Sequence, residues 1–225
     1  KTHALTLLFH LAHQGPKAGG LRGVEKILQK AGIKAVPGNS AVAVFVGTEF
    51  DSITGRGGND GTPRRRTPWG EIAFQLGGAA GFEVVAQHDA EFVEPKGDVI
   101  DKFIPKDRPS LILMDEVLNY ASTYRERGHH NKLYNFLQAL SEVVRGRTNA
   151  VLVGSIPASE LSYTDRDHAD QQRFKNLLDR VGKAVILSVE TETSEIIRRR
   201  LFEWDDRAVA ADGRVMLPKE AHDTC

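Results

Sequence analysis

Four short runs of almost continuously apolar residues recur along the chain, and they constrain its fold more than any other feature. The runs are AVAVFVGT at 41–48, SLILMDE at 110–116, NAVLVGS at 149–155 and KAVILSV at 183–189. Each run is short and rich in β-branched residues, which is typical of strands that are covered on both faces. Helical patterns separate them, so the sequence predicts an α/β fold with a mainly parallel sheet.

The helical patterns are WGEIAFQLGGAA, which starts behind a proline, then GDVIDKFI, NKLYNFLQALSEVVRGR, DQQRFKNLLDRVG and SEIIRRRLFEW. In the third, one face of the expected helix carries five apolar side chains, namely Leu133, Phe136, Leu137, Leu140 and Val144. Two Gly- and Pro-rich segments, QGPKAGGLRG and GRGGNDGTPRRRTP, are expected to be loops.

Composition excludes several classes of protein. The only cysteine is Cys225, so an internal disulfide and a cysteine-rich metal site are both excluded, as suits a cytoplasmic protein. No stretch approaches the ~18 consecutive apolar residues of a membrane helix, and no secretory segment is visible. The 30 Lys and Arg residues balance the 30 Asp and Glu residues, so net charge argues neither for nor against nucleic acid.

The chain opens with Lys1 and Thr2, followed at once by the apolar helical pattern HALTLLFHLA. Phosphate-binding loops of the form GxxxxGK[ST] end in such a pair: the lysine reaches the β- and γ-phosphates, and the hydroxyl binds Mg²⁺. The helix that follows points its N-terminus at the anion. We therefore interpret Lys1 and Thr2 as the tail of a phosphate loop whose glycines lie before residue 1. An ordinary helix start is the alternative for so common a dipeptide.

A second signal comes from Asp115 and Glu116, which end the apolar run LILM at the carboxyl end of an expected buried strand. Ligands of open α/β sheets gather at that edge, and adjacent carboxylates are costly there unless they bind a cation or activate water. In a Walker B motif the Asp holds Mg²⁺ and the Glu polarises the attacking water. A strand that simply ends in acidic surface residues is the alternative.

Ser155 follows the next buried run, VLVG. A polar residue at the tip of this strand serves as a sensor of the γ-phosphate in many ATPases, although a serine here could equally cap the following turn. The local sequence GSIPA is not the GxSxG elbow of α/β-hydrolases, so a serine-hydrolase function lacks its nucleophile motif.

Taken together, KTHALTLLFHLA, VGTEFD, TPWGEIAFQL, LILMDEVLNY, GSIPASE and EIIRRRLFEW resemble a family of uncharacterised prokaryotic AAA+-type P-loop ATPases, catalogued as a domain of unknown function. Genes of that family often lie near DNA methyltransferase genes in proposed phage-defence clusters. The resemblance covers the chain to about Trp204. It implies an ATPase core at 1–190 and the start of a C-terminal helical lid at 191–225.

The resemblance also implies roles for individual residues. Lys1 and Thr2 would bind ATP and its Mg²⁺, Asp115 and Glu116 would form the Walker B pair, and Ser155 would be the sensor. An arginine finger acting on a neighbouring subunit is expected in this class, and Arg180 lies where it is often placed, with Arg173 as a rival. The implied partners are further copies of the chain and either DNA or a DNA-modification protein.

In AAA+ folds the strand before the phosphate loop lies between the sensor strand and the final strand. The expected fold is therefore a three-layer sandwich that lacks this strand, with a gap between the strands at 149–155 and 183–189.

Other polar residues are expected to have no site function. His10 and His13 are spaced to share one helix face but have no acidic or cysteine partner nearby in the sequence. His129 and His130 are expected in a loop at the surface. The arginines of TPRRRTP could contact DNA phosphates, but a solvated loop is the preferred interpretation.

The sequence thus predicts ATP binding and hydrolysis coupled to conformational change in a larger machine. A switch or scaffold that binds nucleotide without turnover is the main alternative, and the intact pair Asp115 and Glu116 favours hydrolysis. A small-molecule phosphotransferase lacks an acceptor-site motif, and a GTPase lacks an NKxD-type motif.

Overall fold

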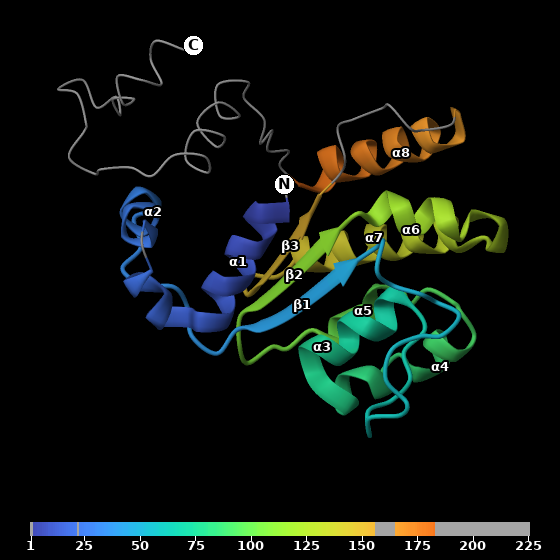
Figure 1. Cartoon of the computed structure of the whole chain (residues 1–225), viewed down its shortest axis with the longest axis horizontal. Coiled ribbons are helices and arrows are strands. Elements are labelled where there is room, and N and C mark those ends of the chain that lie inside the picture. Colours follow the sequence, from blue (N-terminus) through green and yellow to red (C-terminus); the bar gives the residue numbers. More distant parts are fainter. Residues whose placement is uncertain (1, 22, 156–164, 183–225) are drawn as a thin grey trace, which may run out of the picture. The chain divides into compact units, whose positions relative to one another are not determined.

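A three-stranded parallel sheet lies at the centre of the computed structural model (Figure 1), which describes residues 2–21, 23–155 and 165–182. The strands are β1 (Ala41–Val46), β2 (Ser110–Asp115) and β3 (Ala150–Gly154), and β2 lies between the other two. Both pairs are parallel, with Ala43 opposite Ile112 and Ile112 opposite Leu152. The predicted α/β class is confirmed, and so are the first three predicted strands.

Ten helical segments connect or flank these strands in the described part of the chain. They are α1 (Thr2–Gln14), η1 (Gly15–Gly20), α2 (Val24–Ala31), α3 (Pro68–Glu83), α4 (Ala86–Ala90), α5 (Gly97–Phe103), α6 (Val117–Thr123), η2 (Arg125–Arg127), α7 (His129–Arg145) and α8 (Asp165–Val181). None of the described helices is long and apolar enough to cross a membrane. The predicted strand at 183–189, the gap beside it and the lid at 191–225 lie outside the described residues.

Helices α3, α5 and α7 cover one face of the sheet. The side chains of Ala43, Phe45, Ile112 and Met114 point into this layer and are almost fully buried. The five apolar positions predicted for one face of α7 are all buried here, which confirms that pattern. This face therefore holds the main core of the domain.

The opposite face of the sheet carries α1, which packs against β1 and β2. Leu113 is buried on this side, but Val42 and Val44 are only half-buried, and Val151 on β3 is 55% exposed. The expectation that every strand is covered on both faces is therefore wrong for β3. Among the described helices, α1 packs against β1 and β2 on this face but makes no comparable contact with β3.

The outer edge of β1 is closed by a side chain. Gln75 on α3 accepts a hydrogen bond from the Val44 N–H at 2.7 Å and donates one to the Val44 carbonyl at 2.9 Å. Its amide also donates to Glu71, at 2.6 Å. Unpaired strand edges invite pairing with other chains, and at Val44 Gln75 satisfies both backbone groups as a neighbouring strand would.

Glu71 connects this edge to the loop that precedes α3. Its buried carboxylate forms ion pairs with Arg65 at 2.8 Å and Arg56 at 3.5 Å. Arg56 and Arg65 also form an antiparallel backbone bridge. The expectation of a solvated arginine run is therefore wrong for Arg65, which is only 6% exposed. A glutamate one turn into α3, invisible to local pattern reasoning, accounts for this burial.

Replacing Gln75 by alanine removes its hydrogen bonds to both Val44 backbone groups and to Glu71. Because two half-buried backbone groups and the Glu71 carboxylate lose a partner, we expect the free energy of unfolding to fall by about 2 kcal/mol. Gln87→Ala is the matched control, since Gln87 only makes an exposed bond to Glu91, and it should stay within about 0.5 kcal/mol of the parent. Urea unfolding measures both; equal midpoints for the two variants would contradict the role of Gln75.

Candidate functional site

Asp115 ends β2 and is the most heavily bonded acidic side chain at the carboxyl edge of the sheet. It is only 5% exposed. Its Oδ2 accepts a hydrogen bond from the Thr2 hydroxyl at 2.9 Å, and its Oδ1 accepts bonds from the Ser155 hydroxyl and from the Glu116 N–H. A buried carboxylate is stable only with such partners, so these donors explain how the charge is accommodated.

Three separate segments deliver the side chains of this cluster. Thr2 opens α1, Asp115 is the last residue of β2, and Ser155 directly follows β3. The Ser155 N–H also bonds the Met114 carbonyl at 2.9 Å, which continues the β2–β3 pairing to this point. Parallel strands end at the same edge, and the start of α1 lies over that edge. Three of the residues singled out from the sequence thus lie together.

Glu116 adopts an unusual backbone conformation, with φ 52° and ψ 37°. Left-handed values are uncommon for residues other than glycine and often mark functional positions. Its carboxylate accepts a hydrogen bond from the Asn119 side chain at 3.1 Å, and its carbonyl accepts the Asn119 N–H at 3.0 Å. Asn119 therefore fixes both ends of Glu116. This residue was not among the sequence candidates, although its i,i+3 spacing was visible there.

Gly47 makes the tight turn at Glu116 possible. It follows β1, and its N–H bonds the Asp115 carbonyl at 2.9 Å. A Cβ atom at Gly47 would lie 2.1 Å from the Glu116 carbonyl oxygen, closer than any real contact. Only glycine allows β1 to approach the turn that carries Glu116. The sequence showed this glycine at the end of a strand, but not what approaches it.

Among the described residues, the structure does not bring the remaining candidates to the Asp115 cluster. Lys1 lies outside the described residues. Arg180, on α8, forms an exposed ion pair with Glu142 at 3.3 Å. Arg173, also on α8, lies over the Tyr134 ring at 3.7 Å and donates to Asn131 at 2.7 Å. Arg173 is thus engaged by an aromatic ring and an amide, and Arg180 only by a surface glutamate.

Hard oxygen ligands gather at this site. A hydroxyl and a carboxylate are the donors that Mg²⁺ prefers, and it commonly takes one or two protein oxygens and completes its shell with water and phosphate. Among the described residues, no group of three or more His, Cys, Asp or Glu side chains could hold a metal ion unaided. Thr2 and Asp115 could together supply two oxygen ligands to a cation whose remaining ligands would be water or another bound group.

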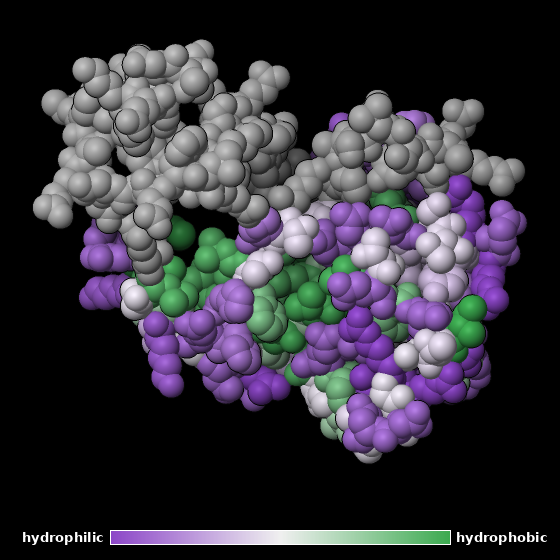
Figure 2. Space-filling model, viewed as in Figure 1, coloured by the Kyte–Doolittle hydropathy of each residue, from purple (hydrophilic) through white to green (hydrophobic). Residues whose placement is uncertain are grey.

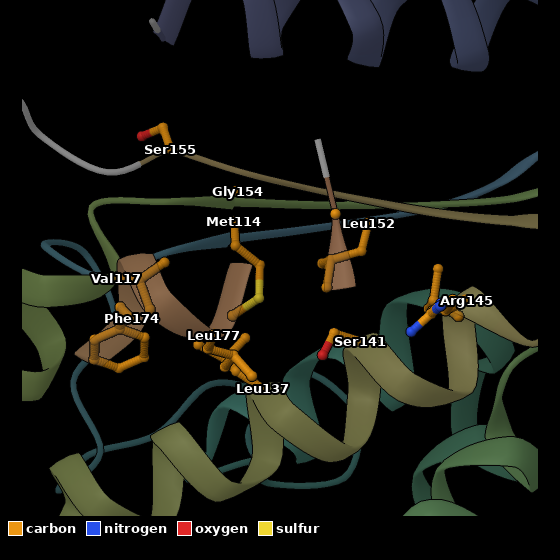
Figure 3. Close-up of a pocket in the computed structure, with 12 residues that line it drawn as sticks. Met114, Val117, Leu137, Ser141, Arg145, Leu152, Gly154, Ser155, Phe174 and Leu177 are labelled. Atoms are coloured by element: carbon orange, nitrogen blue, oxygen red, sulfur yellow. The ribbon is translucent and has the colours of Figure 1, made fainter. Parts of the chain in front are cut away.

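An apolar pocket of about 140 Å³ lies on the other face of the sheet, between β3, α7 and α8. Met114, Leu137, Phe174 and Leu177 line it. In Figure 3 the Ser155 hydroxyl points away from these side chains, toward the side of the sheet that carries α1. Ser155 also borders this pocket, so the polar cluster and the apolar pocket adjoin at Ser155, whose hydroxyl bonds Asp115.

Comparison with known protein families shows to which family the chain belongs. The model described as the DUF499 N-terminal domain matches residues 1–193. The chain belongs to the DUF499 family. No curated protein and no solved structure matches it. In this DUF499 N-terminal domain the match includes every residue of the Asp115 cluster and all the described helices and strands.

Gly47→Ala tests the close approach in the DUF499 domain. The added methyl group must displace the Glu116 carbonyl, so we expect the free energy of unfolding to fall by about 1–3 kcal/mol. Gly146→Ala is the control, because Gly146 has φ −77° and the nearest atom to an added Cβ is at 3.5 Å. It should be neutral or slightly stabilising. Denaturant unfolding that ranks the two variants equally would refute this explanation of Gly47.

Proposed function

We propose that this DUF499 domain is the core of an AAA+-type P-loop ATPase, which binds and hydrolyses ATP with Mg²⁺ and couples this to conformational change in a larger assembly. The observation that carries the proposal is the meeting of Thr2, Asp115 and Ser155 at the carboxyl edge of a parallel sheet. Their separations in the sequence are 113 and 40 residues relative to Asp115. Oxygen ligands gathered from distant segments at this edge are typical of a nucleotide site.

The start of α1 supplies the setting for an anion. No acidic residue of α1 itself lies in its first turn, and the helix end is bonded to the Asp115 carboxylate through Thr2. Lys1 immediately precedes it in the sequence and would add a full positive charge for the phosphates. Backbone N–H groups at a helix start and an adjacent lysine are the usual ligands of terminal phosphates.

Mg²⁺, when bound, would neutralise charge on the β- and γ-phosphates. Thr2 and Asp115 would hold it, and Thr2 would turn its hydroxyl proton away from Asp115 to offer a lone pair. Ser155 would keep its place at Asp115 and orient that carboxylate. Glu116 would accept a proton from the attacking water. At the same time the water oxygen would bond to the γ-phosphorus, and the bond between the γ-phosphorus and the bridging oxygen of the leaving ADP would break.

One observation favours the alternative, a nucleotide-dependent switch without turnover. The Glu116 carboxylate is engaged by Asn119 in this structure. The Asn119 contact limits how far the Glu116 carboxylate can turn toward an attacking water. Hydrolysis would require this contact to open, or to hold the carboxylate in a position from which it can accept the proton. The experiment below distinguishes the two functions.

In the full-length protein, Glu116→Gln should retain ATP binding and reduce hydrolysis by at least about 100-fold, because the amide keeps the shape but cannot accept the proton. Glu83→Gln, a change on the exposed end of α3, is the matched control and should hydrolyse ATP at the parent rate. Phosphate release and ATP binding are measured side by side. A parent protein that binds ATP without turnover would support the switch, and unchanged hydrolysis in Glu116→Gln would exclude Glu116 as the base.

We further propose that Arg180 acts on the nucleotide of a neighbouring subunit in a homo-oligomer, with DNA or a DNA-modification protein as the larger partner. Arg180→Ala should then lose ATP hydrolysis, and so should Lys1→Ala, which lacks the phosphate contact. Mixing the two should restore part of the activity, because some interfaces would combine an intact Lys1 with an intact Arg180. Failure of every mixing ratio, together with a monomeric protein in ATP, would rule out this role.

A further inference from the structure

Three cationic side chains from different segments surround the start of α7. Arg66 comes from the loop before α3, Arg127 from η2, and Lys132 from the first turn of α7. Each acts electrostatically on His129, which opens that helix. We call Arg66, Arg127 and Lys132 the cation cluster. In the described part of the chain none of the three forms an ion pair with an acidic side chain.

The position of His129 differs from the sequence expectation. His129 and His130 were expected in a surface loop, but they begin α7 and are half-buried. The His129 ring stacks on Phe92 with centroids 5.1 Å apart and on Tyr124 at 5.5 Å. Burial first, and then the three cations of the cluster, lower the pKa of His129 below its usual value.

The same aromatic stack fixes Arg66. Its guanidinium lies 4.4 Å from the centre of the Phe92 ring. An aromatic ring thus holds the guanidinium, which forms no ion pair with an acidic side chain of the described residues. The backbone of Phe92 has a φ of 53°. Phe92 holds a left-handed backbone that is rare for an aromatic residue, and it packs against both Arg66 and His129.

The nearby acidic groups are already engaged. Asp89 is 2% exposed and accepts hydrogen bonds from the backbone N–H groups of Arg66 and Thr67 and from the Thr67 hydroxyl. Asp51 accepts bonds from the Tyr124 hydroxyl and the Ile53 N–H. Asp89 attracts Arg66 electrostatically, but neither Asp89 nor Asp51 forms an ion pair with a side chain of the cation cluster.

Several polar atoms at the start of α7 also lack a hydrogen-bond partner. The Nε of Arg66 and the Nδ1 atoms of His129 and His130 are buried and have no hydrogen-bond partner in the described structure. The first turn of α7 has no acidic residue, and its N-cap is Gly128, which offers no side-chain cap. Positive charge, buried polar atoms without a partner and an uncapped helix start therefore coincide.

We propose that the cation cluster at the start of α7 binds a phosphate group. Two arginines and a lysine on three segments suit a multiply charged oxyanion, because arginine donates paired N–H bonds and lysine adds a mobile point charge. The phosphate could belong to a nucleic-acid strand or to a free phosphate compound, and the two sources share this chemistry. The site is separate from the Asp115 cluster and uses none of its residues.

The test uses the full-length protein without ATP or Mg²⁺, so its outcome is independent of the proposed ATPase function. The probe is a fluorescein-labelled 20-nucleotide oligothymidylate, and binding is followed by anisotropy at several salt concentrations. The test variant combines Arg66→Gln, Arg127→Gln and Lys132→Gln. The charge-matched control combines Lys26→Gln, Lys30→Gln and Lys102→Gln, which remove three exposed lysines from α2 and α5.

We expect the test variant to lose at least tenfold in affinity and the control to bind as the parent does. The slope of log affinity against log salt should fall in magnitude by about 2 in the test variant, the value for three lost contacts to a single strand. Inorganic pyrophosphate is the competitor: displacement of the probe at equal concentrations of phosphate groups identifies a free phosphate ligand, and weak displacement identifies a strand.

A second measurement guards against a merely misfolded variant. In the parent protein, a phosphate bound beside His129 should raise the pKa of its imidazole, because the negative charge favours the protonated ring, and NMR titration with and without pyrophosphate records this. Circular dichroism checks that the variants are folded. The proposal is overturned if the parent binds neither probe, or if the test and control variants bind equally and the His129 pKa does not move.

Discussion

The hydrogen bonds to the buried carboxylate of Asp115 hold together the carboxyl end of the sheet. A charge at 5% exposure is tolerated only because hydroxyl and backbone donors from three directions meet it. Those donors also tie the start of α1, the end of β2 and the residue after β3 to one point. The bonding that stabilises the charge therefore also assembles the oxygen ligands of the candidate nucleotide site.

A second polar network stabilises the outer side of strand β1. Gln75 completes the backbone of β1 at Val44, and Glu71 extends from Gln75 to Arg65 and Arg56. Since Arg65 is held inward, its neighbour Arg66 emerges on the other side of the chain and reaches Phe92. The ordering of one arginine in the core thus positions the next one in the cation cluster.

The sequence predicts the described strands well because their signal is local. Apolar runs end in Asp115 and Ser155, and the rule that parallel strands end at one edge brings these residues together without further information. The other features depend on contacts between distant segments. Gly47 is explained only by the Glu116 carbonyl, Arg65 only by Glu71, and the helical position of His129 only by its packing on Phe92 and Tyr124. The short helix α6 carries too few residues for its period to be read from the sequence.

That short helix is also what connects the two polar sites. Helix α6 begins directly after Glu116, and Tyr124 directly follows its last residue. Tyr120 lies between, almost fully buried and within stacking distance of both Tyr124 and His129. A shift of Glu116 relative to Asn119 would therefore move the start of the same rigid element whose end packs on His129. Coupling between ligands at the two sites would have to be equal in both directions, and this helix is the physical element through which it would act.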